Sequence, residues 1–352
     1  MTWLFKRMHV VSPLLKRVVY PALHHSGWLD HVTPVSGYAV VNYHGVFPSD
    51  YSSSDTFVDG SLVRPEAFRE QLQFLKAHYQ IIHPEDFRAL IEHGEPLPPR
   101  AVLITCDDGL LNTVTDMLPV LQSENVPCLF FVTSASCSDQ PATLWFDELY
   151  HLMRIDPLIG LDPNLPADEG PAQPSNGFQA LWWNTVRKAS RWEAPTRANW
   201  LEQLRTSCGP MESFSSDRRW RLLNREELKQ LDQAGMSIGA HTRSHNVLSL
   251  CSDEESRREI QDSKRDIERV LGKPVWAFAY PFGGPSTVSN REVRFAQEAG
   301  FSCAFVNVEH WDTECASSFA VERTHVAGDM TVSELAAHVS GFHKHLQRSV
   351  AR

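Results

Sequence analysis

Apolar runs of strand length alternate with amphipathic stretches of helix length through most of the chain. Strands are expected at 38–42, 80–82, 128–132, 302–306 and 319–323, and in the apolar runs that begin at Ala101, Met236 and Trp276. Between them, apolar positions recur with helical spacing over 65–78, 84–93, 114–124, 226–234, 253–271, 288–299 and 332–346. Strands that alternate with helices indicate a parallel sheet with crossover connections, and hence an α/β fold.

The alternation fails between Ile155 and Phe178, where five prolines fall among Gly, Asp and Asn residues. This composition is typical of a loop or a disordered insertion. The following stretch, 181–204, has helical spacing and contains four tryptophans: Trp182, Trp183, Trp192 and Trp200. These rings could stack on sugar faces, although packing in a core is the commoner use of tryptophan. We expect an insertion at about 155–220 that caps the substrate side of a site.

Two adjacent aspartates end the strand that begins at Ala101. Asp107 and Asp108 stand side by side before Gly109. Neighbouring carboxylates repel each other, and a bound cation or a proton on one of them makes the arrangement stable. An Asp-Gly turn carrying two solvated acids is the alternative interpretation.

Two later strands also run into polar or irregular segments. The strand from Met236 leads to His241 and His245, which one helical turn would place on the same face. Two imidazoles and one carboxylate form the ligand set of an open catalytic metal site, whereas two surface histidines in a chain with 16 are the alternative. The strand from Trp276 breaks at Pro281, where an irregular loop can turn backbone N–H groups toward a ligand or simply end the strand.

Charge and cysteine usage narrow the functional class. The net charge of −10 and the pI near 5.9 argue against a nucleic-acid partner, which calls for a basic patch. The seven cysteines form no Cys-x-x-Cys pair, and Cys106 lies inside the Asp107-Asp108 segment. A reducing, cytoplasmic location fits this pattern best.

The N-terminal segment, 1–37, differs from the rest of the chain in its charge. No stretch approaches the roughly 20 apolar residues of a membrane span, and Met1 to Tyr20 contains no acidic residue although the chain is acidic. A basic amphipathic segment here would suit peripheral association with an anionic membrane, at the inner face of the cytoplasmic membrane. A helix packed on the protein's own surface is the favoured alternative.

The three polar segments, in this order, resemble the motifs of the polysaccharide deacetylase family, the chitooligosaccharide deacetylase homology domain of carbohydrate esterase family 4. The sequence Thr-Cys-Asp-Asp-Gly at 105–109 resembles the first motif, and His-Thr-Arg-Ser-His at 241–245 resembles the second. Phe-Ala-Tyr-Pro-Phe-Gly at 278–283 resembles the third. The pair Tyr43-His44 is similar to a Tyr-His pair near the start of many members, and the resemblance covers residues 38 to 330 or so.

This resemblance implies a distorted (β/α)7 barrel with a helical, proline-rich insertion, in which residues 38–352 form the catalytic domain. In such barrels the chemistry lies at the C-terminal ends of the strands. Five of the residues singled out fall directly after expected strands, which supports the same fold independently: His44, Asp107, Asp108, His241 and Tyr280.

The resemblance also implies roles for the motif residues. Asp108, His241 and His245 would hold a divalent metal, for which Zn²⁺ is favoured by ligand type and Co²⁺, Ni²⁺ or Mn²⁺ are possible. Asp107 would act as the general base toward a metal-bound water. The backbone N–H of Phe282 would help to hold the oxyanion, within a substrate-binding segment that comprises Tyr280, Pro281, Phe282 and Gly283.

The general acid is open at this stage, because the Leu-x-His segment that supplies it in many family members has no good copy here. His325 and His44 are the two candidates. Arg323 would orient Asp107 in place of the arginine found in another form of the third motif. The alternative, which the sequence supports equally, is that Arg323 forms a purely structural salt bridge.

We therefore expect a metal-dependent hydrolase that removes an N-acyl group, and specifically an N-acetyl group, from an amino sugar in a glycan or glycolipid. The cysteine pattern favours a lipid-linked or precursor saccharide over a secreted polymer. A deformylase or amidase acting on a non-sugar C–N bond is one alternative. A catalytically inactive carbohydrate-binding homologue is the other.

Overall fold

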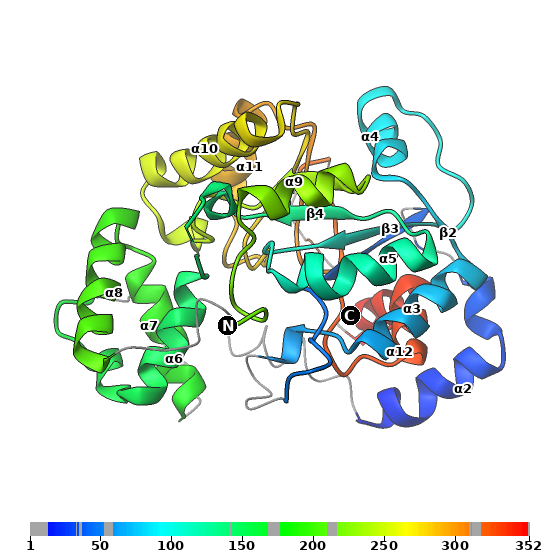
Figure 1. Ribbon diagram of the computed structural model, residues 1–352. Coiled ribbons are helices and arrows are strands. Elements are labelled where there is room, and N and C mark those ends of the chain that lie inside the picture. The colour runs from blue at the N-terminus through cyan, green and yellow to red at the C-terminus, as the bar shows by residue number, and fades with distance from the viewer. Residues whose placement is uncertain are drawn as a thin grey trace.

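One parallel sheet organises the molecule (Figure 1). The computed structural model describes residues 13–32, 34, 37–52, 59–140, 142–167, 177–209, 217–309, 311 and 318–350. Within these residues the strand order is β7-β6-β5-β4-β3-β1-β8, and β2 pairs only with β3. The strands are β1 (Tyr38–Tyr43), β2 (Gln80–Ile81), β3 (Ala101–Cys106), β4 (Leu129–Val132), β5 (Ser237–Ala240), β6 (Ala277–Ala279), β7 (Cys303–Phe305) and β8 (Thr324–His325).

The two edges of the sheet are joined by a single segment. Thr324 of β8 pairs with Val41 of β1, and Val321, three residues earlier, forms a parallel bridge with Phe305 of β7. The sheet therefore curls into a ring, and the expected distorted (β/α)7 barrel is confirmed. Apart from β2, most strand residues are buried, as expected for a parallel sheet that is covered by helices on both faces.

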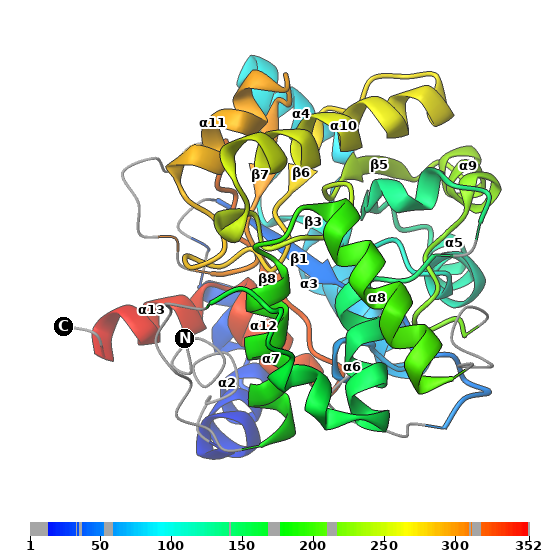
Figure 2. The same ribbon diagram turned by 90° about the vertical axis from the view of Figure 1, so that its left-hand side faces the viewer.

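Helices cover the outside of the ring (Figures 1 and 2). They are α3 (Pro65–His78), α4 (Pro84–His93), α5 (Leu118–Glu124), α9 (Arg225–Gln233), α10 (Asp253–Leu271), α11 (Asn290–Glu298), α12 (Val332–Val339) and α13 (Phe342–Val350). Local sequence determines where they begin. At the start of α9, Asn224 accepts a hydrogen bond from the Glu227 amide, and the Glu227 side chain accepts one from the Asn224 amide, which is a capping box.

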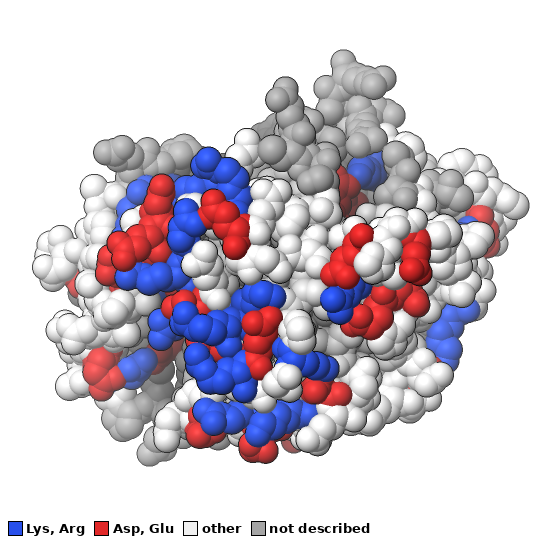
Figure 3. Space-filling model, turned by 90° about the horizontal axis from the view of Figure 1, so that it is seen from above, with Lys and Arg blue, Asp and Glu red and all other residues white. Residues whose placement is uncertain are grey.

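The surface over α10 carries charges of both signs. Figure 3 shows Lys and Arg side chains interspersed with Asp and Glu side chains on this face. Many of them form ion pairs one helical turn apart, such as Arg269 with Asp266 at 3.0 Å. Such pairs are typical of a solvated outer helix. The inner face of α10 nevertheless buries two glutamates, Glu255 and Glu259.

The insertion forms a helical unit with its own apolar cluster. Its elements are α6 (Trp145–Ile155), the short turn η6 (Pro157–Leu161), α7 (Phe178–Ala189) and α8 (Ala194–Cys208). The single helix predicted over 181–204 is therefore two helices. Trp182, Trp183 and Trp200 are buried in this cluster, so packing is their main role. Figure 2 shows the insertion alongside the strand ends.

The described part of the N-terminal segment packs on the domain. Its elements are η1 (Leu15–Val19), α2 (Tyr20–His25) and η2 (Trp28–His31). Tyr20 is buried and its hydroxyl lies 2.6 Å from Nδ1 of His343, while Leu14 and Val18 are exposed. Residues 1–12 lie outside the described residues. Among the described helices, none is long and apolar enough to cross a bilayer.

Candidate metal and hydrolytic site

The C-terminal ends of the strands bring most of the predicted site residues together. His44 follows β1, Asp107 and Asp108 follow β3, and the His241 segment follows β5. Because strands of a parallel barrel all point the same way, these ends meet on one face. Residues that are far apart in the sequence, such as His44 and His245, thus share one site.

Three potential metal-ligand atoms converge at this face. Asp108 Oδ1 lies 3.1 Å from His245 Nε2 and 3.4 Å from His241 Nε2, and the three atoms lie within 4.8 Å of one another. All three side chains are buried. His241 Nδ1 donates to the Ala279 carbonyl at 2.8 Å, which turns Nε2 toward Asp108.

The converging atoms fit a divalent metal. Asp108 Oδ1 is buried and has no hydrogen-bond partner among the described residues, which is costly unless another group satisfies it. Burial would raise the pKa of Asp108, but the two imidazoles outweigh burial and hold that pKa well below its usual range. One carboxylate oxygen and two imidazole nitrogens suit Zn²⁺, Co²⁺ or Ni²⁺.

The loop that carries the two histidines is not helical, so the expected helical turn is wrong. Thr242 and His245 have positive φ angles of 63° and 56°, and the Thr242 hydroxyl accepts from the His245 amide at 3.0 Å. Asp108 at 75° and Phe282 at 60° share this left-handed conformation. Such backbone costs on the order of 1–3 kcal/mol per residue and clusters at functional sites.

Asp107 is held from the opposite side to the histidines, by a buried arginine. Arg323 donates from two nitrogens to the two carboxylate oxygens of Asp107, each at 2.7 Å. Asn42 donates to Asp107 Oδ2 at 2.9 Å and also contacts the Asn307 side-chain oxygen at 3.2 Å. Burial favours a raised pKa, but Arg323 and His241 lower the pKa of Asp107, so it is ionised at neutral pH.

The segment after β6 contributes through its backbone and one ring. Tyr280 is fully buried and its hydroxyl donates to the Phe319 carbonyl at 3.2 Å, so its side chain points into the core and the segment presents its backbone to the site. Pro281 is buried as well. Gly283 has a φ of 54°, and a Cβ there would lie 2.2 Å from the Asn307 amide nitrogen, which excludes any larger residue.

Phe282 lies between the metal-ligand group and the insertion. Its ring centroid is 4.9 Å from that of His245 and 5.2 Å from that of Trp183. Its backbone N–H has no hydrogen-bond partner among the described residues. The side chain of Phe282 thus helps to enclose His245, and its amide is available to a ligand.

The two general-acid candidates are in contact with each other. The ring centroids of His44 and His325 are 4.8 Å apart, in an edge-to-face arrangement. His44 also acts electrostatically on both aspartates, since its charge contributes to lowering the pKa of Asp107 and of Asp108. Its Nδ1 is buried without a hydrogen-bond partner in the described structure.

Several residues of the site were not predicted from the sequence. Asn42 of β1 donates to Asp107, and Asn307 in the loop after β7 accepts from the same Asn42 side chain. At the start of α6, Trp145 donates its ring N–H to the His245 carbonyl at 3.4 Å, and the Phe146 ring lies 4.9 Å from the His245 ring. No local pattern marks these residues, because their contacts join distant segments.

Asp147, the next residue of α6, was also missed. Burial and the charge of Asp108 raise the pKa of Asp147 well above its usual range. Together with Trp145 and Phe146, this places the first turn of α6 at the border of the site. Helix α6 is therefore part of the site's surroundings, although most of it lies before the insertion expected at about 155–220.

Solved deacetylase structures share this architecture. The chain superposes on a Streptococcus pyogenes deacetylase, PplD, in complex with acetate, with a TM-score of 0.55 and 16% identity over 87% of this chain and 99% of that one. For IcaB from Ammonifex degensii the TM-score is 0.55 and the identity 18%, over 86% of this chain and 97% of that one. At these identities the likeness establishes the fold.

Sequence comparisons match part of the chain to polysaccharide deacetylases. The polysaccharide deacetylase model matches residues 176–304, which include His241, His245 and the segment after β6. Over 110 residues the chain is 32% identical to poly-beta-1,6-N-acetyl-D-glucosamine N-deacetylase of Escherichia coli K12, covering 31% of this chain but only 16% of that protein. Both matches cover only part of the chain, and over that part they support the resemblance of its motifs to polysaccharide deacetylases.

Proposed function

We propose that this protein is a metal-dependent hydrolase that removes an N-acetyl group from an amino sugar in a glycan. The observation that carries the proposal is that the two adjacent aspartates have different contacts. Asp108 faces two imidazoles with an unsatisfied oxygen, whereas Asp107 is fixed by Arg323. These contacts support our assignment of Asp108 as a metal ligand and of Asp107 as the base.

Asp108, His241 and His245 would hold the metal, which when bound acidifies a coordinated water and polarises the substrate carbonyl. Asp107 takes a proton from the attacking water. Its two contacts with Arg323 keep the carboxylate ionised and limit its rotation. A base that is already oriented contributes more than one that must find its geometry.

Two further steps are stabilisation of the oxyanion and protonation of the departing nitrogen. The amide of Phe282 would donate to the oxyanion that forms on the acyl group. A proton must reach the departing nitrogen as the C–N bond breaks. We assign that proton to the pair His44 and His325, and within it to His44, because its charge acts on both aspartates.

The substrate is inferred from relatives and surroundings. The E. coli relative is named for poly-beta-1,6-N-acetyl-D-glucosamine, and we propose an amino-sugar glycan for this chain. The Phe282 and Phe146 rings beside His245 offer apolar faces of the kind that sugar rings pack against. A lipid-linked saccharide is a narrower form of the same proposal.

Acetate release from N-acetylglucosamine oligomers tests this function. We expect activity with Zn²⁺ or Co²⁺, loss after chelation, and recovery when metal is restored. Formate released from an N-formyl sugar, with no acetate from the oligomers, would instead identify a deformylase. Sugar binding without release of any acyl group would identify an inactive homologue.

Membrane association and a cytoplasmic location are separate proposals. The exposed side chains of Leu14 and Val18 lie beside Lys16 and Arg17, which is the composition of an interfacial surface. Tyr20 holds the following helix on the domain. Deletion of residues 1–18 should abolish sedimentation with anionic vesicles while hydrolysis of a soluble oligomer continues. Equal sedimentation of the shortened chain would remove the proposal.

A further inference from the structure

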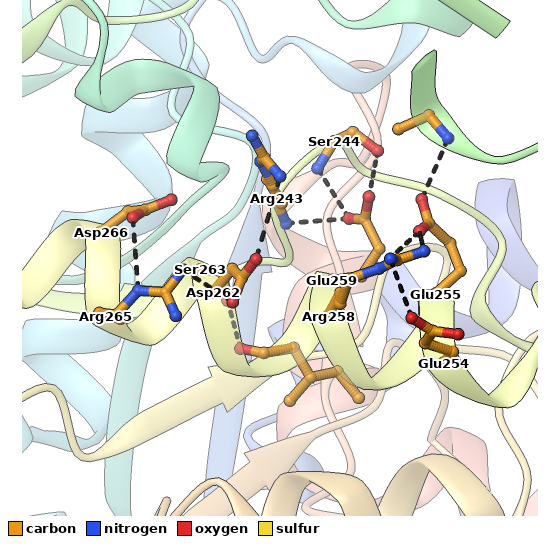
Figure 4. A network of polar contacts seen from close by, with 12 residues as sticks. Arg243, Ser244, Glu254, Glu255, Arg258, Glu259, Asp262, Ser263, Arg265 and Asp266 are labelled. Atoms are coloured by element: carbon orange, nitrogen blue, oxygen red, sulfur yellow. Dashed lines mark hydrogen bonds and ion pairs between the residues drawn. The ribbon is translucent and has the colours of Figure 1, made fainter. Parts of the chain in front are cut away.

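Glu259 on the inner face of α10 contacts the loop that carries the metal-binding histidines (Figure 4). Its Oε2 accepts from the backbone amides of Arg243 at 3.0 Å and of Ser244 at 2.8 Å. Its Oε1 accepts from the Ser244 hydroxyl at 2.5 Å. Glu259 is 2% exposed, so these three donors replace the water that the carboxylate loses.

The residues that Glu259 contacts lie between His241 and His245. The flanking residue Thr242 and the ligand His245 both adopt left-handed backbone, which persists only where surrounding contacts fix it. The loop therefore needs an external constraint if both imidazoles are to face Asp108. Two backbone amides bound to one buried carboxylate provide that constraint.

The insertion reaches the same loop from the other side. Arg197 of α8 is 2% exposed and donates to the Ser244 hydroxyl oxygen at 3.0 Å. It also donates to the Trp192 carbonyl at 3.2 Å and lies over the Trp145 ring, 4.6 Å from its centroid. Ser244 is thus held between a buried carboxylate of the barrel and a buried guanidinium of the insertion.

We propose that Glu259, through Ser244 and with Arg197, is a positioning residue that holds the His241–His245 loop in its metal-binding conformation. The insertion then supports the metal centre as well as covering it. This inference rests on the proposed metal centre but not on any particular substrate. Groups that orient metal ligands typically change metal affinity by about 10- to 100-fold when removed.

Glu255 offers a matched control one helical turn away. It is a buried glutamate of the same helix, accepting from the Ala194 amide at 3.1 Å and from Arg258 at 2.9 Å (Figure 4). No contact links it to the 241–245 loop within the described structure. Glu255→Gln and Glu259→Gln therefore remove the same charge from the same helix, and only the second removes the loop's partner.

The test is the affinity of the full-length protein for Co²⁺, together with the visible absorption of the bound ion, which reports its ligand geometry. We expect Glu259→Gln to weaken Co²⁺ binding by about 10- to 100-fold and to change the absorption spectrum. Glu255→Gln should match the wild-type protein in both. Ser244→Ala, which keeps both backbone amides, should give a smaller loss and serves if Glu259→Gln folds poorly.

The outcomes distinguish failure of the metal centre from failure of the positioning role of Glu259. If the wild-type protein binds no Co²⁺, the metal centre itself fails, and this inference fails with it. If the wild-type protein binds Co²⁺ and Glu259→Gln binds it equally well with the same spectrum, the positioning role is wrong while the metal centre stands. Equal losses in both glutamate variants would also overturn it, because the effect would then belong to the helix in general.

Discussion

Two clusters of one carboxylate and two histidines occur in the described structure, and they differ in what their atoms already contact. In the first, Asp108 Oδ1 is unsatisfied although it faces two imidazole nitrogens. In the second, formed by Glu309, His338 and His343, Glu309 lies 2.6 Å from His338 Nδ1 and also accepts from Thr324 at 2.7 Å.

One histidine of the second cluster binds other parts of the protein. His343 contacts the Tyr20 hydroxyl through Nδ1 and the Gln347 amide nitrogen through Nε2, each at 2.6 Å. This cluster thus ties the N-terminal helix α2 to α12 and α13. Donor types that converge are therefore not enough to mark a metal site. An unpaired imidazole nitrogen is not enough either, because His338 Nε2 also has no partner in the described structure; a carboxylate oxygen left unsatisfied on left-handed backbone, as in Asp108, is the better sign.

Removing one histidine from each cluster tests most strongly whether only the first cluster binds metal. His241→Ala should lose the bound metal and reduce turnover by at least about 10³-fold, since a metal ion supplies several kcal/mol of transition-state stabilisation. His338→Ala should keep both metal and turnover. Elemental analysis and initial rates check this, and a loss of metal in His338→Ala would make the second cluster a metal site.

The next largest effect concerns the two histidines that border the first cluster. His44→Gln should lower kcat for an amide substrate by about 10² to 10³-fold, because a general acid is lost. His325→Gln should cost less than 10-fold or so, because His325 would act through His44. The comparison is of kcat values at equal metal content. A larger loss in His325→Gln would reverse the assignment.

The first cluster also differs from the second in its neighbours. Beside its metal ligands lies Asp107, the proposed base, which Arg323 holds in place. Arg323→Lys keeps the charge but cannot form both contacts with Asp107. We expect kcat to fall by about 10- to 100-fold through misplacement of the base, with metal content unchanged. Unchanged kcat would reduce the pair to a structural salt bridge.

The second cluster should affect how the free energy of unfolding depends on pH. Burial and then the charge of His338 lower the pKa of His343 from 6.5 to about 4. Between these values the unfolded chain binds a proton that folded His343 does not, so the free energy of unfolding decreases as pH falls through this window. The loss attributable to His343 is up to about 3 kcal/mol.

Denaturant titrations of the wild-type protein and His343→Gln from pH 7 to pH 4 measure that contribution. The variant should show a shallower decline in the free energy of unfolding than the wild-type protein. Parallel curves would mean that His343 does not carry the pH dependence of this region.

Most of the barrel and its ligands could be predicted from local patterns. Buried parallel strands are continuous apolar runs, and Asp108 and His241 directly follow such runs, so strand ends alone indicated that they meet. The helix starts were equally local: Asn224 and Glu227 cap α9 as their spacing predicts.

Features that depend on contacts between distant segments could not be predicted. The loop at His241–His245 has helical spacing, but the carboxylate of Glu259 on another element holds it in a non-helical shape. Tyr280 lies in a motif and next to the site, yet its side chain points into the core toward Phe319. The sequence does not reveal the direction of a side chain at a strand end.

The most direct test of the central claim compares Asp107→Asn with Asp108→Asn, two neighbours with opposite assignments. Metal content and initial rate of acetate release are measured for each, with and without added Zn²⁺. Asp107→Asn should retain metal and lose about 10² to 10⁴ in rate, as for a missing general base, while Asp108→Asn should lose metal and recover partly with excess Zn²⁺. Loss of metal from Asp107→Asn with rescue by Zn²⁺ would contradict the account.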